Sequence, residues 1–434
     1  MLIEIFGENF GCFRDEFRLS MLATDIDPGS KRGVAEVTID GDPEPLRLLR
    51  AAAIYGPNAS GKSTFLRAAR ALHFFILRSA RFRSDEEIVY YEPFAGDDSK
   101  SRPVRLGLKA VVDSAVYDYE LAFNHSAVIA ERLERRTATT SNVLVDRQGQ
   151  KVSGDWTADE QFLLATREFR PNALLLSLAD TLTPKLAGRI APGLYSLLGF
   201  FDGSTGNRFS SFSQPAAQLA KDNPDFKEWL LQQLRAADIG VTELTIKQLR
   251  RVEAPKGFLF EEFDEGSGSG PSSEPVRQRL AFRHAGPNGT FAVPYDNESF
   301  GTKKLVDLAP LLFRLFSEGR STAAFVDEIG ASLHPTLLVE LIRHINCAPR
   351  LSAARGQLIF ATHETSLIDN EARDAVLRRD QIYFAAKDNG GVGRLYALSD
   401  FQERQNINLR KRYLEGRYGA IPAIGEFPAG GEDD

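Results

Sequence analysis

The stretch that decides the fold is residues 48–64, which read LLRAAAIYGPNASGKST. It begins as a short apolar run and continues as a loop bounded by Gly56 and Gly61. Apolar residues then recur at helical spacing, at Leu66, Ala69 and Leu72. We therefore expect a buried strand, a glycine loop and a helix, in that order. Residues 56–63 match the pattern G-x-x-x-x-G-K-[ST] in full, and this strand–loop–helix context is the one in which the pattern binds phosphate.

The residue types in this loop suit phosphate binding. Glycines let the backbone curl so that successive N–H groups point at phosphate oxygens, and the start of the following helix adds a positive field. Lys62 is expected to place its charge on the β- and γ-phosphates, and the Ser63 hydroxyl is expected to be a ligand of Mg²⁺. The residues expected to bind the nucleotide are Gly56, Pro57, Asn58, Ala59, Ser60, Gly61, Lys62, Ser63 and Thr64.

An acidic pair ends a second apolar run, residues 323–328, which read AAFVDE. A buried strand there would deliver Asp327 to the Mg²⁺ side of the phosphates and leave Glu328 able to polarise an attacking water molecule. Taken alone, the pair would fit an ordinary strand end with exposed acids equally well. Its place behind a phosphate loop favours the metal and catalytic roles.

Two more segments carry weaker signals. Ser299 and Gly301 precede a helical pattern at residues 302–316 and predict a second anion-binding surface; the alternative is a plain helix cap by Ser299 or Thr302. His363 follows a strand pattern at residues 358–361, where it could donate a hydrogen bond to a γ-phosphate or simply be a structural or exposed histidine. His334, in a loop after the acidic pair, is a weaker candidate.

Composition excludes several classes of protein. The 434 residues carry a net charge of −6, so any contact with nucleic acid would have to be a local basic patch. The two cysteines, Cys12 and Cys347, make neither a disulfide framework nor a four-cysteine zinc site. No apolar run approaches the ~20 residues that span a bilayer. We expect no membrane contact and a cytoplasmic location.

The order of the patterns predicts an α/β fold with a split ATPase head. Residues 1–110 and 290–434 form the head, and residues 111–289 form an insertion of β-hairpins followed by helices. Helical character is expected from residue 157 to about residue 248. Residues 264–275, DEGSGSGPSSEP, are of low complexity and are expected to be a mobile loop.

Four motifs in this order resemble those of ATP-binding-cassette-type AAA ATPases, of the kind found in DNA-maintenance proteins and in the heads of the old-lysogenisation-defect (OLD) group. The motifs are GPNASGKS at 56, ESFGT at 298, DE at 327 and ATHE at 361, and the resemblance covers about residues 1–110 and 290–400. It implies a P-loop head with a mixed sheet and an antiparallel β subdomain, and ATP and Mg²⁺ as cofactors. The site residues it implies are Lys62, Glu328 and His363 as catalytic groups and Ser63 and Asp327 as metal ligands.

The resemblance also implies assembly and partners. Two heads would pack as a homodimer or part of a higher homo-oligomer, and the segment with Ser299 and Gly301 would cap the nucleotide held by the other copy. The S-x-G-T form of that segment and residues 409–422, LRKRYLEGRYGAIP, look like those of stand-alone ATPases from bacterial restriction and phage-defence operons. Such ATPases are usually paired with a separately encoded nuclease or Toprim-like effector.

One family feature is missing. Cassette ATPases carry a glutamine after the first helix, but here no glutamine follows Ser63 until Gln148. Either a residue near the segment Glu92-Pro93-Phe94 takes that role or the coupling differs, and we assign the role to no residue.

The function that the resemblance implies is that of a nucleotide-switched ATPase that senses or restrains a separately encoded effector in phage defence. The alternatives are a DNA repair or recombination head that binds duplex DNA, a self-contained OLD-type nuclease, and a transporter ATPase. Too few residues follow His363 for a Toprim domain, and the paired acids Asp25 and Asp27 are expected in a loop. The long helical insertion argues against a transporter ATPase.

A basic segment could touch nucleic acid or an acidic partner, or could be a solvated helix face. Its residues are Arg404, Arg410, Lys411, Arg412 and Arg417, with Tyr413 and Tyr418.

Overall fold

The computed structural model describes residues 1–25, 32–202, 216–237, 239–253, 259–263, 277–316, 321–347, 355–368, 375–403 and 407–422. The loop expected at residues 264–275 lies outside these ranges, as do Asp27 and Arg404. Among the described residues, no helix has the length and apolar character needed to cross a bilayer.

The described residues form strands and helices in the following order. The strands are β1 (Leu2–Glu8), β2 (Phe17–Ser20), β3 (Val34–Val37), β4 (Leu46–Leu49), β5 (Ala51–Tyr55), β6 (Val104–Val112), β7 (Ala115–Phe123), β8 (Val128–Arg136), β9 (Ser141–Gln148), β10 (Lys151–Ser153), β11 (Leu198–Asp202), β12 (Val241–Glu253), β13 (Leu259–Phe263), β14 (Arg277–Gly286), β15 (Gly289–Pro294), β16 (Ser321–Asp327), β17 (Arg355–Ala361), β18 (Ile382–Lys387) and β19 (Gly393–Ala397). The α-helices are α1 (Lys62–Arg78), α2 (Glu160–Ala165), α3 (Leu175–Leu182), α4 (Pro184–Ala187), α5 (Ile190–Leu197), α6 (Ala216–Asp222), α7 (Pro224–Ala236), α8 (Phe300–Phe316), α9 (Pro335–Cys347) and α10 (Leu409–Leu414).

A six-stranded sheet, the central sheet, holds the strands on which the predicted motifs depend. Its strand order is β11-β16-β17-β5-β18-β19, and all neighbours are parallel except the pair β18 and β19. Strands β5, β16 and β17 consist mainly of apolar residues, as expected for parallel strands that are covered on both faces. Because parallel strands end at the same edge of a sheet, the segments that follow these three strands meet there.

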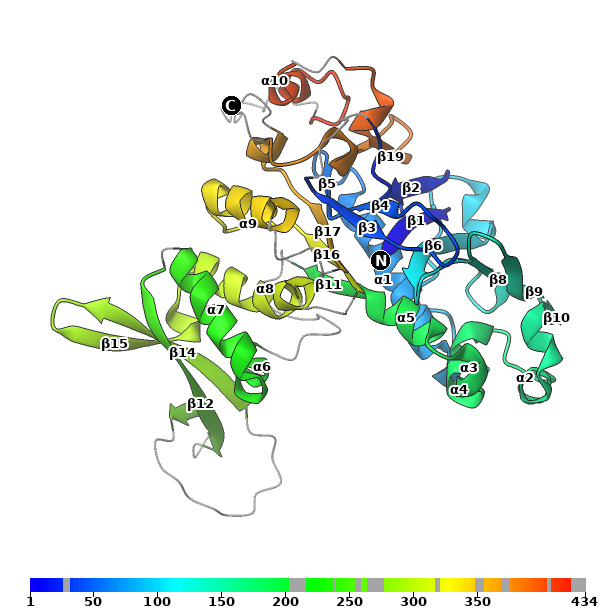
Figure 1. Ribbon diagram of the computed structural model, residues 1–434, viewed down its shortest axis with the longest axis horizontal. Coiled ribbons are helices and arrows are strands. Elements are labelled where there is room, and N and C mark those ends of the chain that lie inside the picture. Colours follow the sequence, from blue (N-terminus) through cyan, green and yellow to red (C-terminus); the bar gives the residue numbers. More distant parts are fainter. Residues whose placement is uncertain are drawn as a thin grey trace, which may run out of the picture.

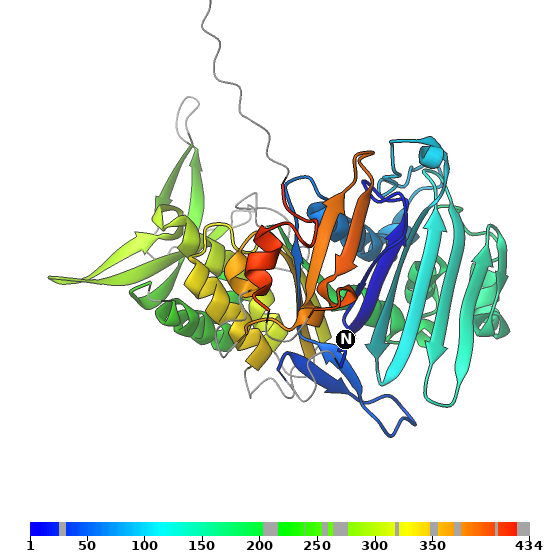
Figure 2. The same ribbon diagram turned by 90° about the horizontal axis from the view of Figure 1, so that it is seen from above.

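The two faces of the central sheet pack into different cores. Ala52 and Ile54 of β5 face a core shared with α1 and with a seven-stranded antiparallel sheet of order β10-β9-β8-β7-β6-β1-β2. Ala51, Ala53 and Tyr55 face the opposite core, which also holds residues of α8, α9 and α10. Figure 1 and Figure 2 show the antiparallel sheet at one end of the molecule and the helices α8 and α9 across the central sheet from it.

A third unit, which we call the arm, consists of α6, α7 and a four-stranded sheet of order β13-β12-β14-β15. The inner side of the arm packs on α8 through a core that includes Phe226, Phe282 and Leu305. Figure 2 shows the hairpin of β14 and β15 projecting from the end of the molecule opposite the antiparallel sheet. Strands β14 and β15 pair antiparallel up to Gly286 and Gly289, with the turn between these two residues.

Two segments expected to be helical are strands. Residues 157–248 contain α2 to α7, but Leu198–Asp202 forms β11, which pairs in parallel with β16, and Val241–Glu253 forms β12. The run Leu198-Gly199-Phe200-Phe201 is too short for its periodicity to separate a buried strand from a helix turn. Pairing with β16 decides the conformation, and Gly199 lets the strand approach Leu311 of α8.

The expected limits of the insertion fall inside strands. Strand β6 spans the limit at residues 110 and 111, and β15 spans the limit at residues 289 and 290. Strands β7 to β10 continue the antiparallel sheet that β1 and β6 begin, and β11 joins the central sheet. The division into a head and an insertion stays a prediction, and any boundary between them must lie outside these two strands.

Helix α8 carries a partly buried carboxyl group, Asp307, from which we expect pH-dependent stability. Both oxygens of Asp307 accept hydrogen bonds from the Tyr295 hydroxyl at 2.7 Å. Burial raises the pKa of Asp307 to about 6, from the usual aspartate value of 3.8. Because the folded protein then binds this proton more tightly than the unfolded chain does, Asp307 opposes folding above pH 6, and this cost shrinks as the pH falls.

We therefore expect Asp307→Asn to remove part of the pH dependence of stability. Between pH 7.5 and pH 5 the wild-type protein should gain about 1 kcal/mol of unfolding free energy from Asp307, and the variant should lack that gain. Urea unfolding of both proteins at the two pH values measures the difference. Equal pH dependence in the two proteins would show that Asp307 does not titrate in this range.

Candidate nucleotide-binding site

The phosphate loop connects β5 to α1 as the sequence predicts. Ala59 has a φ of 60° and Gly61 a φ of 113°, so the loop turns through left-handed conformations before the helix begins at Lys62. A methyl group at Gly56 would overlap the carbonyl oxygen of Ala385 in β18. Gly56 is therefore required by a close backbone approach, and Gly61 by its backbone conformation.

The side chains of the loop leave polar groups available for a phosphate. Lys62 is 6% exposed, and its ammonium donates to the carbonyl oxygens of Gly56 at 2.8 Å and Pro57 at 2.9 Å. The Ser60 hydroxyl is buried and has no hydrogen-bond partner among the described residues. Ser63 is exposed at the first turn of α1, where a hydroxyl can reach a metal ion held by phosphates. This donor set fits a nucleotide phosphate with Mg²⁺.

The acidic pair lies at the same edge of the central sheet. Asp327 is the last residue of β16, and Glu328 follows it with a φ of 45°. The Glu328 N–H donates to the Asp327 carboxylate at 3.1 Å. The next N–H, of Ile329, donates to the Ala361 carbonyl at 3.1 Å, which ties this turn to the end of β17.

His363 completes the cluster from the segment after β17. The preceding Thr362 is buried and its N–H donates to the Ile54 carbonyl at 3.1 Å, so the segment is fixed to β5. Burial and then the Lys62 ammonium lower the pKa of His363, while the carboxylates of Glu328 and Asp327 act in the opposite direction. These four side chains therefore lie within electrostatic reach of one another, and the lowered pKa keeps His363 mainly neutral at pH 7.

Burial also lowers the pKa of Lys62, and here again Asp327 and Glu328 act in the opposite direction. An ammonium faced by two carboxylates and a neutral imidazole is a charge arrangement that can hold Mg²⁺, phosphate oxygens and an attacking water molecule. The structure thus brings together the predicted catalytic residues Lys62, Glu328 and His363 and the predicted metal ligands Ser63 and Asp327. Their roles in catalysis and metal binding stay predictions.

The second predicted anion-binding surface, at Ser299 and Gly301, lies at the start of α8. The Ser299 hydroxyl accepts a hydrogen bond from the Thr302 N–H at 3.1 Å, so Ser299 caps the first turn of α8. Gly301 lies against the carbonyl of Ser332, in the loop that follows the acidic pair. Within the described part of the chain, no hydrogen bond joins Ser299 or Gly301 to the phosphate loop. The helix cap by Ser299, the alternative given by the sequence, is therefore present. If Ser299 and Gly301 also bind nucleotide, it would be a nucleotide held by a second molecule.

A buried lysine that sequence analysis missed holds the acidic turn in place. The ammonium of Lys304, one turn into α8, donates to the Glu328 carbonyl at 2.8 Å and lies 5.8 Å from the ring centroid of Phe201 in β11. No sequence motif singles out Lys304, because its role depends on where α8 meets the end of β16. The only sign of this role in the sequence is that Lys304 lies beside apolar residues in a helical pattern.

We expect Lys304→Met to slow ATP hydrolysis about 10-fold with little change in ATP affinity. A hydrogen bond to a charged group contributes about 1.5–3 kcal/mol, and its loss frees the backbone of Glu328 to leave its left-handed conformation. Steady-state turnover and the binding of a fluorescent ATP analogue measure the two quantities. Lys303→Met, at the next position on the same helix, is the matched control and should retain near-normal turnover.

Two N-terminal segments pack on the phosphate loop. The loop between β1 and β2 lays Cys12 and Phe13 against Gly61. Glu92 lies beside the loop between β1 and β2. Its carbonyl accepts a hydrogen bond from the Gly11 N–H at 2.6 Å, and its carboxylate accepts one from Arg67 of α1 at 3.1 Å. The segment Glu92-Pro93-Phe94 is therefore close to the first turns of α1, although the role of the missing glutamine remains unassigned.

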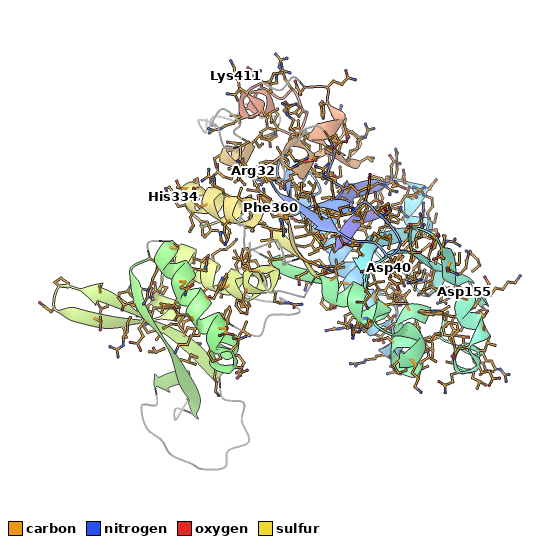
Figure 3. The ribbon with its side chains drawn as sticks, viewed as in Figure 1. Arg32, Asp40, Asp155, His334, Phe360 and Lys411 are labelled. Atoms are coloured by element: carbon orange, nitrogen blue, oxygen red, sulfur yellow. The ribbon has the colours of Figure 1, made fainter. Side chains whose placement is uncertain are left out.

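The weaker candidates lie at the surface. His334 precedes α9, where its ring nitrogen accepts from the Thr336 N–H at 3.2 Å and so caps the helix. Figure 3 places His334 at the outer end of α9 and Lys411 on α10, at the top of the view. In the basic segment, Tyr413 and Tyr418 are buried in an aromatic cluster around Phe384, so neither ring is available to stack on a base.

The described arginines of that segment have local partners. Arg412 bonds the Glu403 carboxylate at 2.6 Å, Arg417 pairs with Glu415 at 3.3 Å, and Arg410 donates to the Thr365 hydroxyl at 3.2 Å. This pattern is that of a folded tail with a solvated face, the alternative left open by the sequence.

A comparison with protein families agrees with this geometry. The family model described as "AAA domain, putative AbiEii toxin, Type IV TA system" matches residues 51–369, from the first residue of β5 to just beyond His363. The chain belongs to this family. As an AAA-type domain it is a nucleotide-binding ATPase domain of the P-loop α/β class, and ATP with Mg²⁺ is the cofactor pair general to such domains. A search of the curated proteins finds no match.

Proposed function

We propose that this protein is an ATP-hydrolysing switch that controls a separately encoded effector, a nuclease for example, in bacterial defence against phage. The observation that carries the enzymatic part is the meeting of Lys62, Asp327, Glu328 and His363 at one edge of three neighbouring parallel strands. The family match supports the ATPase domain. The similarity of the S-x-G-T segment and of the tail to ATPases of defence operons supports the biological role.

In this proposal, Lys62 and the loop N–H groups hold the phosphates while Ser63 and Asp327 hold Mg²⁺. Mg²⁺ when bound would neutralise the developing charge on the phosphates. Glu328 accepts a proton from the attacking water molecule, and the neutral His363 donates to the γ-phosphate. Each group comes from a segment fixed to the sheet, so little reorganisation is needed once ATP enters.

We propose that two copies close over ATP, with Ser299 and Gly301 of each facing the nucleotide of the other. Two features support this arrangement. Ser299 is exposed, and the neighbouring Phe300 is 79% exposed although it is a large apolar side chain. Aromatic side chains are enriched where a protein surface is covered by a partner.

The test is the mass of the protein with and without ATP. Light scattering of a slowly hydrolysing variant, Glu328→Gln, should give at least a dimer with ATP and Mg²⁺ and a smaller mass without them. Lys62→Ala, which cannot hold the phosphates, is the control and should show no ATP-dependent change. A mass that does not respond to ATP would exclude the closed dimer.

The effector is tested separately, by co-expression with the product of the neighbouring gene. A nuclease-like neighbour that co-purifies with the protein in an ATP-dependent manner would support control of an effector. A neighbour from replication or repair, together with ATP-dependent binding of duplex DNA by the protein alone, would favour the alternative of a DNA-maintenance head.

The family description favours a second candidate, in which this chain is the toxic member of a toxin–antitoxin pair. The two candidates differ in what happens when the protein is expressed alone. A toxin should arrest growth of the host and be relieved by its neighbour, whereas a switch without its effector should be harmless.

A further inference from the structure

The hairpin of β14 and β15 leaves one edge of the arm open. Strand β15 pairs with β14 on one side and ends the strand order β13-β12-β14-β15. Residues of an antiparallel pair alternate between exchanging hydrogen bonds and exchanging none, so alternate residues of β15 direct their N–H and C=O groups to the other side. No described residue pairs with β15 on that side. These backbone groups can therefore accept a further strand.

Strand β15 also lacks the charges that keep sheet edges from pairing. It reads GTFAVP, and only Pro294 at its end is of a type that protects an edge, which leaves residues 289–293 able to pair. In the sheets that the structure describes, every other edge strand carries a charged residue. These residues are Arg18 in β2, Glu36 in β3, Arg47 in β4, Lys151 in β10, Asp202 in β11, Glu261 in β13 and Arg394 in β19.

The side chains of β15 are exposed as well. Residues 289–292 are all exposed, and Phe291 is 54% exposed although it is large and apolar. Its ring stacks on His284 of β14, with 5.8 Å between the ring centroids. Figure 1 and Figure 2 both show the hairpin extending away from the rest of the molecule. The described body of the protein therefore leaves room for a partner along this strand.

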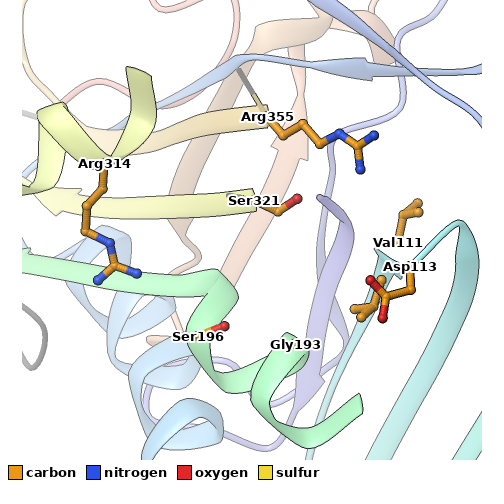
Figure 4. A pocket seen from close by; sticks show the side chains of 8 residues that line it. Val111, Asp113, Gly193, Ser196, Arg314, Ser321 and Arg355 are labelled. Carbon is orange, nitrogen blue, oxygen red and sulfur yellow. The ribbon is translucent and has the colours of Figure 1, made fainter. Parts of the chain in front are cut away.

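A cavity at the start of β16 and β17 is less suited to a ligand. It has a volume of about 310 Å³, and its lining includes Arg314, Ser321 and Arg355. Figure 4 shows the two arginine side chains on opposite sides of Ser321, with their guanidinium groups pointing apart. The two groups do not converge on one point, so the edge of β15 is the stronger candidate for a binding surface.

Strand β15 is suited to pair with a second copy of itself. Two identical strands related by a two-fold axis run antiparallel, and each contact is made twice. Phe291 is the middle residue of 289–293, so full overlap of the two strands places it opposite its counterpart in the second copy. Aromatic residues that face each other across two strands stabilise a sheet, whereas like charges in that position destabilise it. Self-pairing of β15 brings an aromatic pair together and no like charges.

We propose that two copies of this protein associate through β15, which joins their arms into one continuous antiparallel sheet without the help of nucleotide. Two short strands make a small interface, so the dissociation constant is expected in the micromolar range. This association does not rest on the proposed function. If the heads also close over ATP, each chain has two different two-fold contacts, and ATP would join these pairs into larger assemblies.

The proposal is tested by sedimentation of the full-length protein without nucleotide, at concentrations up to about 100 µM. The wild-type protein should be a dimer at the upper end of this range. Phe291→Lys and Phe291→Glu should each weaken association at least about 10-fold, because the aromatic pair is lost and like charges face each other. An equimolar mixture of the two variants should restore most of the dimer, since opposite charges then meet. Ser153→Lys on the exposed edge strand β10 is the matched control and should associate as the wild type does.

Lys62→Ala separates this interface from the closed dimer over ATP, and it should keep the nucleotide-free dimer. A dimer that is lost in Lys62→Ala and kept in Phe291→Lys would assign association to the heads and overturn the proposal. A wild-type protein that stays monomeric without nucleotide up to about 100 µM would overturn it too, and would leave the edge of β15 to a different protein. Failure of the mixed variants to associate, when each retains the circular dichroism of the wild type, would exclude pairing centred on Phe291.

Discussion

Replacing Glu328 with glutamine is expected to lower the rate of ATP hydrolysis by about 10²-fold to 10⁴-fold, the usual contribution of a general base. Glu328 follows the end of β16, within electrostatic reach of His363. Glutamine has nearly the same shape but cannot accept the proton of the attacking water molecule. ATP binding should survive, because Lys62 and the loop N–H groups that hold the phosphates are unchanged. The steady-state rate of phosphate release and the affinity for ATP measure the two effects.

The control for this substitution is Glu340→Gln on α9, where the carboxylate is exposed and pairs with Arg343. It should hydrolyse ATP at the wild-type rate. If Glu328→Gln keeps full turnover, the assignment of Glu328 as the base is wrong. If it loses ATP binding as well, the residue acts on the nucleotide pocket and not on the chemical step.

The second large effect is expected on the free energy of unfolding, when a buried ion pair in the antiparallel sheet is broken. Arg147 of β9 and Glu131 of β8 have side chains 0% and 1% exposed, with 3.8 Å between their charged atoms. The Arg147 guanidinium also donates to the carbonyls of Ala173 at 2.6 Å and Pro171 at 3.0 Å. The pair thereby holds the segment before α3 against the sheet.

Glu131 has its own set of donors. It accepts hydrogen bonds from the Leu175 N–H at 2.7 Å and the Leu176 N–H at 2.9 Å, the first two residues of α3, and from the Tyr119 hydroxyl at 2.8 Å. Negative charge is favourable at this end of a helix. Burial nevertheless raises the pKa of Glu131, and Arg147 acts in the opposite direction.

Arg147→Met is therefore expected to lower the free energy of unfolding by about 3–5 kcal/mol, because it leaves a buried carboxylate without its partner. The midpoint of urea unfolding, followed by circular dichroism, measures the loss. Arg132→Met on β8 of the same sheet is the control, since Arg132 is 45% exposed and its pairs with Asp146 and Glu134 should contribute less than about 1 kcal/mol. A loss below 1 kcal/mol in Arg147→Met would show that the network is not a major source of stability.

Much of the site could be predicted because it depends on local sequence. The phosphate loop needs glycines at two positions, a lysine at the first helical residue and a strand before them, all within residues 51–63. The acidic pair and His363 are each recognisable as polar residues that end an apolar run. Because these apolar runs pair as parallel strands, their ends meet at one edge of the sheet. The order of the motifs along the chain was therefore sufficient to predict which residues form the cluster.

Other features depend on contacts between distant segments. Strand β11 lies more than a hundred residues before its partner β16, and its short run LGFF fits a helix turn or a strand equally well. Lys304 acts on Glu328 only because α8 packs beside the end of β16. The tyrosines of the tail look like a base-stacking surface in the sequence, but they are buried against Phe384.

By itself, then, the sequence determined that this protein has a phosphate loop, an acidic pair and a histidine in the order of an AAA-type ATPase, because backbone conformation and charge at these positions are local properties. Only the tertiary structure decided that the antiparallel sheet crosses the expected boundary at residue 110, that Lys304 supports the acidic turn, and that β15 is the open edge of the arm. These features come from packing and pairing between segments far apart in the chain, and no local pattern encodes which surfaces will meet.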